Sequence, residues 1–65
     1  MQSNWTSTKF DLPQEGYVVE TKISDANGER NHARLVRERN LWWHEDKTMY
    51  VYYTPTHWRY ATKNI

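Results

Sequence analysis

The side chains best suited to chemistry in this chain are three histidines, His32, His44 and His57. Pairs of histidines that share a metal ion on one helix are usually four residues apart, and these are spaced much further. The chain has no cysteine, which excludes the cysteine-containing zinc sites. His44 is followed by Glu45 and Asp46, a polar run that we interpret as a turn, and no serine or threonine has a position that pairs it with His57. The sequence therefore predicts no metal site, no cofactor and no catalytic centre.

The basic residues that could bind a partner lie in residues 30–39, where four arginines face one glutamate in a chain of net charge +1. Arg30, His32 and Arg34 recur at every second position, so an extended strand would set them about 6.8 Å apart on one face. Such a ladder could meet phosphate groups or an acidic protein surface. It could equally be a solvated face on which Glu20 neutralises Arg34.

Aromatic residues are the other candidates for binding, because four tryptophans and five tyrosines take the place of scarce aliphatic residues. Each large ring buries about 150–250 Å², so most of them are expected in the core. Trp42, Tyr50 and Tyr52 are the exception, because the strand pairing that we expect sends them to the face away from the core. They are either covered by the C-terminal segment or form an exposed platform.

The elements that position these residues are predicted to be β-strands. Residues 17–24 alternate β-branched and polar side chains, and the following DANGE is typical of a hairpin. A three-residue loop of residues 26–28, with Gly28 in the left-handed region, keeps apolar residues opposite apolar ones, whereas a two-residue loop mixes the faces. The predicted pairs are Val18–Val36, Val19–Leu35, Glu20–Arg34, Thr21–Ala33 and Lys22–His32.

The rest of the chain is predicted to continue the sheet. A turn at residues 38–40 leads to a strand over 41–44, and a three-residue loop at 45–47 leads to a strand over 48–54. Residues 57–61 are expected to form a last edge strand beyond a proline. The residues that these pairings assign to the core are Val19, Ile23, Leu35, Leu41, Trp43, Met49 and Val51.

The N-terminal residues 1–16 are predicted to form an extended arm that ends in a turn, LPQEG. The expected anchors of the arm are Trp5, Phe10 and Leu12. Residues 17–61 then form the sheet, and 65 residues suffice for one domain. The predicted fold is all-β, a small antiparallel meander of four or five strands that could close into a partly open barrel.

The expected location is the cytoplasm. No apolar run approaches the length of a membrane span, and residues 1–9 lack the apolar stretch of a signal peptide. The absence of cysteine agrees with a reducing compartment.

A spaced pattern covers nearly the whole chain: Trp5, Asp11-Leu12-Pro13, Gly16, Val18-Val19 and Thr56-His57-Trp58. It resembles a family of short domains of unknown function that are common in phages and prophages. Those domains begin roughly W-[IV]-S-x(5)-L-P-x-x-G and close on T-H-W, an apolar residue and a proline. This chain departs from the family at Thr6, where an aliphatic residue is usual, and after Trp58. The resemblance implies a phage or prophage accessory protein and brings no catalytic residues.

These observations favour a non-enzymatic protein-binding module that acts on a host protein, as an inhibitor for example, and that does not contact a membrane. The expected contact residues are Trp42, Tyr50, Tyr52, Arg30, His32 and Arg34. One alternative is recognition of nucleic acid or a nucleotide, with rings stacked on bases and arginines on phosphates. The other is a structural role through self-association of sheet edges as a homo-oligomer.

Overall fold

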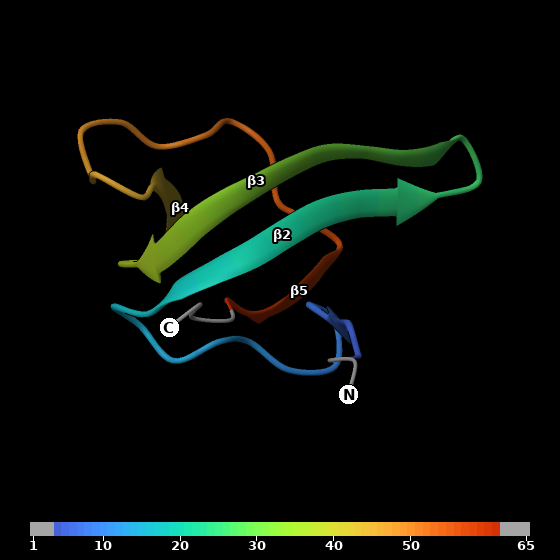
Figure 1. Ribbon diagram of the computed structural model, residues 1–65, viewed down its shortest axis with the longest axis horizontal. Helices are drawn as coiled ribbons and strands as arrows, with labels where there is room; N and C mark the ends of the chain where they lie inside the picture. Colours follow the sequence, from blue (N-terminus) through green and yellow to red (C-terminus); the bar gives the residue numbers. More distant parts are fainter. Residues whose placement is uncertain (1–3, 62–65) are drawn as a thin grey trace.

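The computed structural model describes residues 4–61, and these contain five antiparallel strands in a single open sheet. The strands are β1 (Thr6–Ser7), β2 (Val18–Asp25), β3 (Gly28–Glu38), β4 (Leu41–His44) and β5 (His57–Tyr60). Their order across the sheet is β1-β5-β2-β3-β4 (Figure 1). The predicted all-β antiparallel fold is confirmed: β2, β3 and β4 form a meander, and β5 returns to the free side of β2. Residues 4–61 contain no helix that is long and apolar enough to cross a membrane.

The hairpin of β2 and β3 has the predicted register in its inner half. The observed pairs are Val18–Val36, Val19–Leu35, Glu20–Arg34 and Thr21–Ala33. Gly28 has a φ of 105°, in the left-handed region as predicted. The prediction for the tip is wrong, because Asp25 pairs with Gly28 and leaves a loop of only two residues, Ala26 and Asn27.

One extra residue in β3 reconciles the two-residue tip with the inner register. The pairing shifts between Thr21 and Ile23, so that Lys22 faces two residues of β3, Asn31 and His32. Asn31 has a φ of 58°, a conformation that asparagine adopts more readily than most residues. This β-bulge replaces the predicted Lys22–His32 pair.

The turn between β3 and β4 also differs from the expected structure. Glu38 pairs with Leu41, so the loop holds only Arg39 and Asn40, whose φ values are 55° and 66°. Two successive positive φ values are typical of a type I′ turn, whose twist matches that of the flanking strands. The predicted three-residue turn at 38–40 is wrong by one position, and a slip of one residue exchanges the two faces of β4.

The two adjacent tryptophans of β4 therefore exchange the places that the sequence predicted. Trp42 is buried, with 5% of its surface exposed, whereas Trp43 lies opposite Val36 and is half-buried. The core cluster consists of Val19, Leu35, Trp42 and Trp58, with Ala33 and Val51 packed against it. The other predicted core members are outside it: Leu41 and Met49 are exposed, and Ile23 is half-buried.

Residues 45–56 cross the core face as an irregular connection, and the predicted strand over 48–54 is absent. The amide of Val51 donates a 2.8 Å hydrogen bond to the carbonyl of Trp42, which holds the middle of the connection against β4. The side chain of Val51 packs against the core. Figure 1 shows the connection passing behind β3 and β2 on its way to β5.

β5 was predicted as an edge strand but lies between β1 and β2, because the N-terminal arm supplies the edge. The Trp58 ring on β5 is buried and its Nε1 donates a 3.0 Å hydrogen bond to the carbonyl of Asp11 in the arm. Of the predicted anchors, Trp5 is half-buried, whereas Phe10 and Leu12 are 86% and 42% exposed. The arm is thus held by hydrogen bonds and Trp5 rather than by three apolar contacts.

Candidate functional site

Three aromatic rings form a continuous row where β4 meets the connection that follows it, and two of them, Tyr50 and Tyr52, are exposed, whereas Trp43 is half-buried. Trp43 and Tyr50 face each other across an isolated bridge, with ring centres 5.5 Å apart. Tyr50 and Tyr52 are 6.2 Å apart, and both contacts are edge-to-face, a favourable geometry for aromatic pairs. We call Trp43, Tyr50 and Tyr52 the tyrosine patch.

The tyrosine patch is apolar, open to solvent and incompletely hydrogen-bonded. Tyr50 is 45% exposed and Tyr52 is 93% exposed. Neither hydroxyl has a hydrogen-bond partner among residues 4–61. Two neighbours of the patch are also exposed: Leu41 on β4, and Met49, which precedes Tyr50 in the chain. Rings with a free polar tip are typical of protein contact surfaces.

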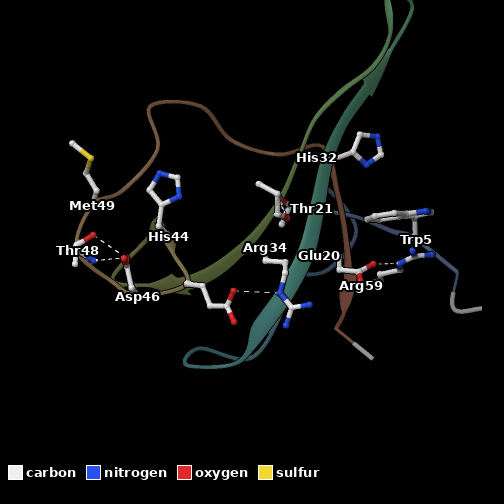
Figure 2. A pocket seen from close by; sticks show the side chains of 12 residues that line it. Trp5, Glu20, Thr21, His32, Arg34, His44, Asp46, Thr48, Met49 and Arg59 are labelled. Carbon is white, nitrogen blue, oxygen red and sulfur yellow. Dashed lines mark hydrogen bonds and ion pairs between the residues drawn. The ribbon is translucent and has the colours of Figure 1, made fainter. Parts of the chain in front are cut away.

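A groove of about 990 Å³ lies beside β3. Figure 2 shows Trp5, His32 and Arg59 at one end of it and His44, Thr48 and Met49 at the other. Arg34 of β3 lies between these two groups. The groove thus joins the N-terminal arm, the edge of β3 and the turn that follows β4.

The charged side chains of the groove are engaged with one another. Arg34 Nε lies 3.3 Å from a carboxylate oxygen of Glu45, and Arg59 Nε lies 2.7 Å from one of Glu20. Arg59 also stacks on the ring of Trp5, 4.2 Å from its centre. These pairs leave the groove with a mixed surface rather than a basic one.

The acidic end of the groove is shaped by the turn after β4. Asp46 accepts hydrogen bonds from both the backbone amide and the hydroxyl of Thr48, at 3.1 and 2.8 Å. These two donors, the amide foremost, hold the pKa of the Asp46 carboxyl below its ordinary value. Asp46 therefore keeps its negative charge in moderately acidic solution.

The predicted aromatic contact residues are divided between the core and the surface. Trp42, expected on the face away from the core, is one of the core residues because of the two-residue turn that precedes it. Tyr50 and Tyr52 are exposed and lie side by side. Of the two alternatives that the sequence left open, the exposed one holds for Tyr50 and Tyr52, and Trp43 lies beside them in place of Trp42.

The predicted basic ladder does not exist as one surface. The bulge sets Arg30 opposite Ile23, and therefore on the other face of the sheet from Arg34. Arg30 instead binds both carboxylate oxygens of Asp25 at 3.0 Å, which lowers the pKa of Asp25. His32 remains on the groove with Arg34, and its Nε2 lies 3.8 Å from Glu29.

Of the groove residues, only His32 and Arg34 were among the expected contact residues. Trp5 and Arg59 of the groove and Trp43 of the tyrosine patch were not. The groove residues come together because β5 inserts beside β2 and sets Arg59 opposite Glu20. A signal for this pairing exists in the sequence, since opposite charges favour cross-strand neighbours, but it is not specific enough to choose β2 as the partner.

Metal chemistry finds no support in the described structure. Within residues 4–61, no three histidine, aspartate or glutamate side chains gather closely enough to hold a metal ion. His57 Nδ1 lies 2.8 Å from the hydroxyl of Thr56, next to it in the chain.

Comparison of the chain with protein-family models, with curated proteins and with solved structures found no match. The likeness to phage and prophage domains therefore stays a prediction.

Proposed function

We propose that this chain is a non-enzymatic protein-binding module whose contact surface is the tyrosine patch. The observation that carries the proposal is the exposure of Tyr50 and Tyr52, 45% and 93%, in a row of rings continuous with Trp43. Tyrosine and tryptophan dominate the energetics of protein interfaces, because one rigid ring buries much area at little entropic cost. A small domain that keeps such rings outside its core has a surface suited to a partner.

The exposed tyrosines and the predicted arginine contacts lie apart from each other, which favours a protein partner over nucleic acid. Surfaces that bind single-stranded nucleic acid combine stacking rings with a basic groove along the backbone. Here Arg30 is engaged by Asp25 at the hairpin tip, and Arg34 is engaged by Glu45 in the groove. Neither arginine is free to meet phosphates beside Tyr50 and Tyr52.

The partner that we propose is a host protein, which the chain would bind as a phage or prophage accessory factor in the cytoplasm. This part of the proposal is supported by the spaced residues from Trp5 to Trp58 that resemble phage and prophage domains. Binding to a host factor would act as inhibition wherever the patch covers the working surface of that factor.

Capture from host lysate tests the proposal. Tagged wild type is compared with Tyr50→Ala/Tyr52→Ala and with Phe10→Ala, which removes an 86% exposed ring outside the patch. Loss of two contact rings should reduce capture of a specific partner by at least about tenfold, a change of about 1.4 kcal/mol. The Phe10 variant should capture as wild type does. Equal capture by all three proteins would contradict the assignment of the patch.

A further inference from the structure

β3 has an unpaired stretch of backbone on the side that carries β4. β4 pairs with residues 35–38 only, and the chain turns away after His44. In the part of the chain that the structure describes, no strand pairs with residues 29–34 on that side. An unpaired row of amides and carbonyls is a ready template for another strand.

The backbone groups of Arg34 point toward this open side. On the outer side of β4, Trp42 accepts a hydrogen bond from Val51 and His44 donates one to Met49, both 2.8 Å. Because backbone groups alternate in direction along a strand, those of Leu41 and Trp43 point toward β3. Trp43 pairs with Val36, so the backbone groups of Val36 point toward β4. Those of Arg34, two residues earlier in β3, point to the same side.

The backbone groups of Glu29 also point toward the open side. The carbonyl of Lys22 accepts a 3.0 Å hydrogen bond from Thr56 on the side of β5, so Ile23 and Asp25 are turned to β3. Their partners are Arg30 and Gly28. Glu29 lies between these two residues, so its backbone groups point away from β2.

The bulge is what gives Glu29 and Arg34 the same direction. In a regular strand, two positions five residues apart face opposite sides, so they cannot pair with each other across a two-fold axis. The extra residue at Asn31 changes this alternation by one. The open edge is thereby suited to pairing with an identical edge.

The groove of the candidate site reaches the open edge of β3. It is lined by His32, Ala33 and Arg34 of β3 and continues to the turn after β4, and on its other side it extends over β2 and β5 to Trp5. Figure 2 shows His44 and Asp46 on the side of the turn.

We propose that two copies of this chain pair antiparallel through residues 29–34 of β3, about a two-fold axis between Asn31 and His32. The axis is fixed by geometry, because the centre of the open edge lies between these two residues. Glu29 then lies opposite Arg34 of the partner subunit, and the same pair recurs by symmetry. The interface joins two five-stranded sheets and leaves the tyrosine patch outside it, so it is independent of the proposed function.

The direction of the backbone groups selects this register over the next one. With the axis between Asn31 and His32, Arg30 lies opposite Ala33 of the partner subunit, and no like charges oppose each other. A shift of one residue would set Arg30, whose backbone groups are turned to β2, opposite Arg34 of the partner subunit, whose backbone groups point to the open side, and such a pair makes no ladder hydrogen bonds. The same edge is therefore complementary to itself in one arrangement.

Engineered cysteines test the proposal, since the chain has none of its own. Purified Glu29→Cys/Arg34→Cys, mildly oxidised, should form a covalent dimer of twice the 8.0 kDa chain mass, because each pair brings two cysteines face to face. Glu29→Cys alone and Arg34→Cys alone are the matched controls. In each, the two identical positions lie about 17 Å apart, so these variants should stay monomeric. Circular dichroism before oxidation confirms that all three are folded.

Four outcomes would overturn the proposal. One is a double variant that stays monomeric although folded. Another is dimerisation of the single variants to the same extent as the double variant, since the contact would then be unspecific. The third is a double variant that remains monomeric alone but forms a mixed disulfide with another protein in host lysate, because the edge would then take a foreign strand. Wild type that sediments as a monomer up to about 1 mM, the range of weak association, would also contradict self-pairing.

Discussion

Trp42 lies opposite Arg37 in the ladder between β3 and β4, and this pairing faces its ring into the core. The neighbouring Trp43 is consequently turned to the other face, where it contacts Tyr50. The position of the tyrosine patch thus depends on the length of one turn, Arg39-Asn40, that lies outside both the core and the patch.

The turn itself is open to improvement, because Arg39 holds a φ of 55° that costs an arginine about 1 kcal/mol. We expect Arg39→Asn to raise the free energy of unfolding by up to about 1 kcal/mol, since asparagine suits the first position of a type I′ turn. Urea denaturation measures the change. Ala26→Asn, at a two-residue loop position without a positive φ, should stay within about 0.5 kcal/mol of wild type. Equal effects of the two variants would contradict the type I′ turn.

Asp25 should titrate below the ordinary range of an aspartate because Arg30 donates two hydrogen bonds to it. A folded-state pKa below the unfolded value stabilises the fold above the unfolded pKa, and this contribution is lost as the pH falls through the folded pKa. Arg30→Gln should raise the titration midpoint of Asp25 in carbon-detected NMR. Asp46, whose pKa is lowered by Thr48 instead, should titrate unchanged in the same sample. If the titration midpoint of Asp25 is the same in Arg30→Gln as in wild type, the pairing is refuted.

Thr56 ties the connection to β2, because its hydroxyl accepts a 2.7 Å hydrogen bond from the amide of Ser24. Thr56→Val keeps the shape and leaves this partly buried amide without its acceptor, so we expect a loss of about 1–3 kcal/mol. Thr54→Val is the matched control, because Thr54 is exposed and its hydroxyl makes no hydrogen bond within residues 4–61. Thermal unfolding compares the two variants, and similar melting temperatures would show that the Thr56 contact is unimportant.

Tyr52 should matter for binding and not for stability. Its side chain is 93% exposed, and surface substitutions of this kind change stability by no more than about 0.5 kcal/mol. Tyr52→Ala is therefore expected to unfold at the wild-type denaturant concentration while losing partner capture. A clear drop in stability would mean that Tyr52 is part of the folded core.

The inner half of the first hairpin could be predicted from sequence because both of its faces are patterned. Val19 and Leu35 must meet on one face and Glu20 and Arg34 on the other, so a slip of one residue is costly. The tip carries no such constraint, since it is polar on both faces. The two-residue loop and the bulge at Asn31 were therefore beyond the reach of this pattern.

The length of the turn between β3 and β4 was mispredicted because its sequence lacks the usual signal of a two-residue turn. Type I′ turns are usually recognised by glycine, and here Arg39 and Asn40 both adopt positive φ values without one. Trp42 and Trp43 are alike in size and polarity, so the alternation of β4 cannot tell which one is buried. The exposed row of rings could be predicted as a type of surface, but its tryptophan could not.

The register of β4 is tested most directly by the change in stability when each of the two adjacent tryptophans is removed in turn. Trp42→Ala empties a core position and should lower the free energy of unfolding by about 3–5 kcal/mol, or leave the domain unfolded. Trp43→Ala removes a half-buried ring and should cost no more than about 2 kcal/mol, with the fold retained. If urea denaturation shows Trp43→Ala to be the more damaging change, the register of β4 and the tyrosine patch built on it are both wrong.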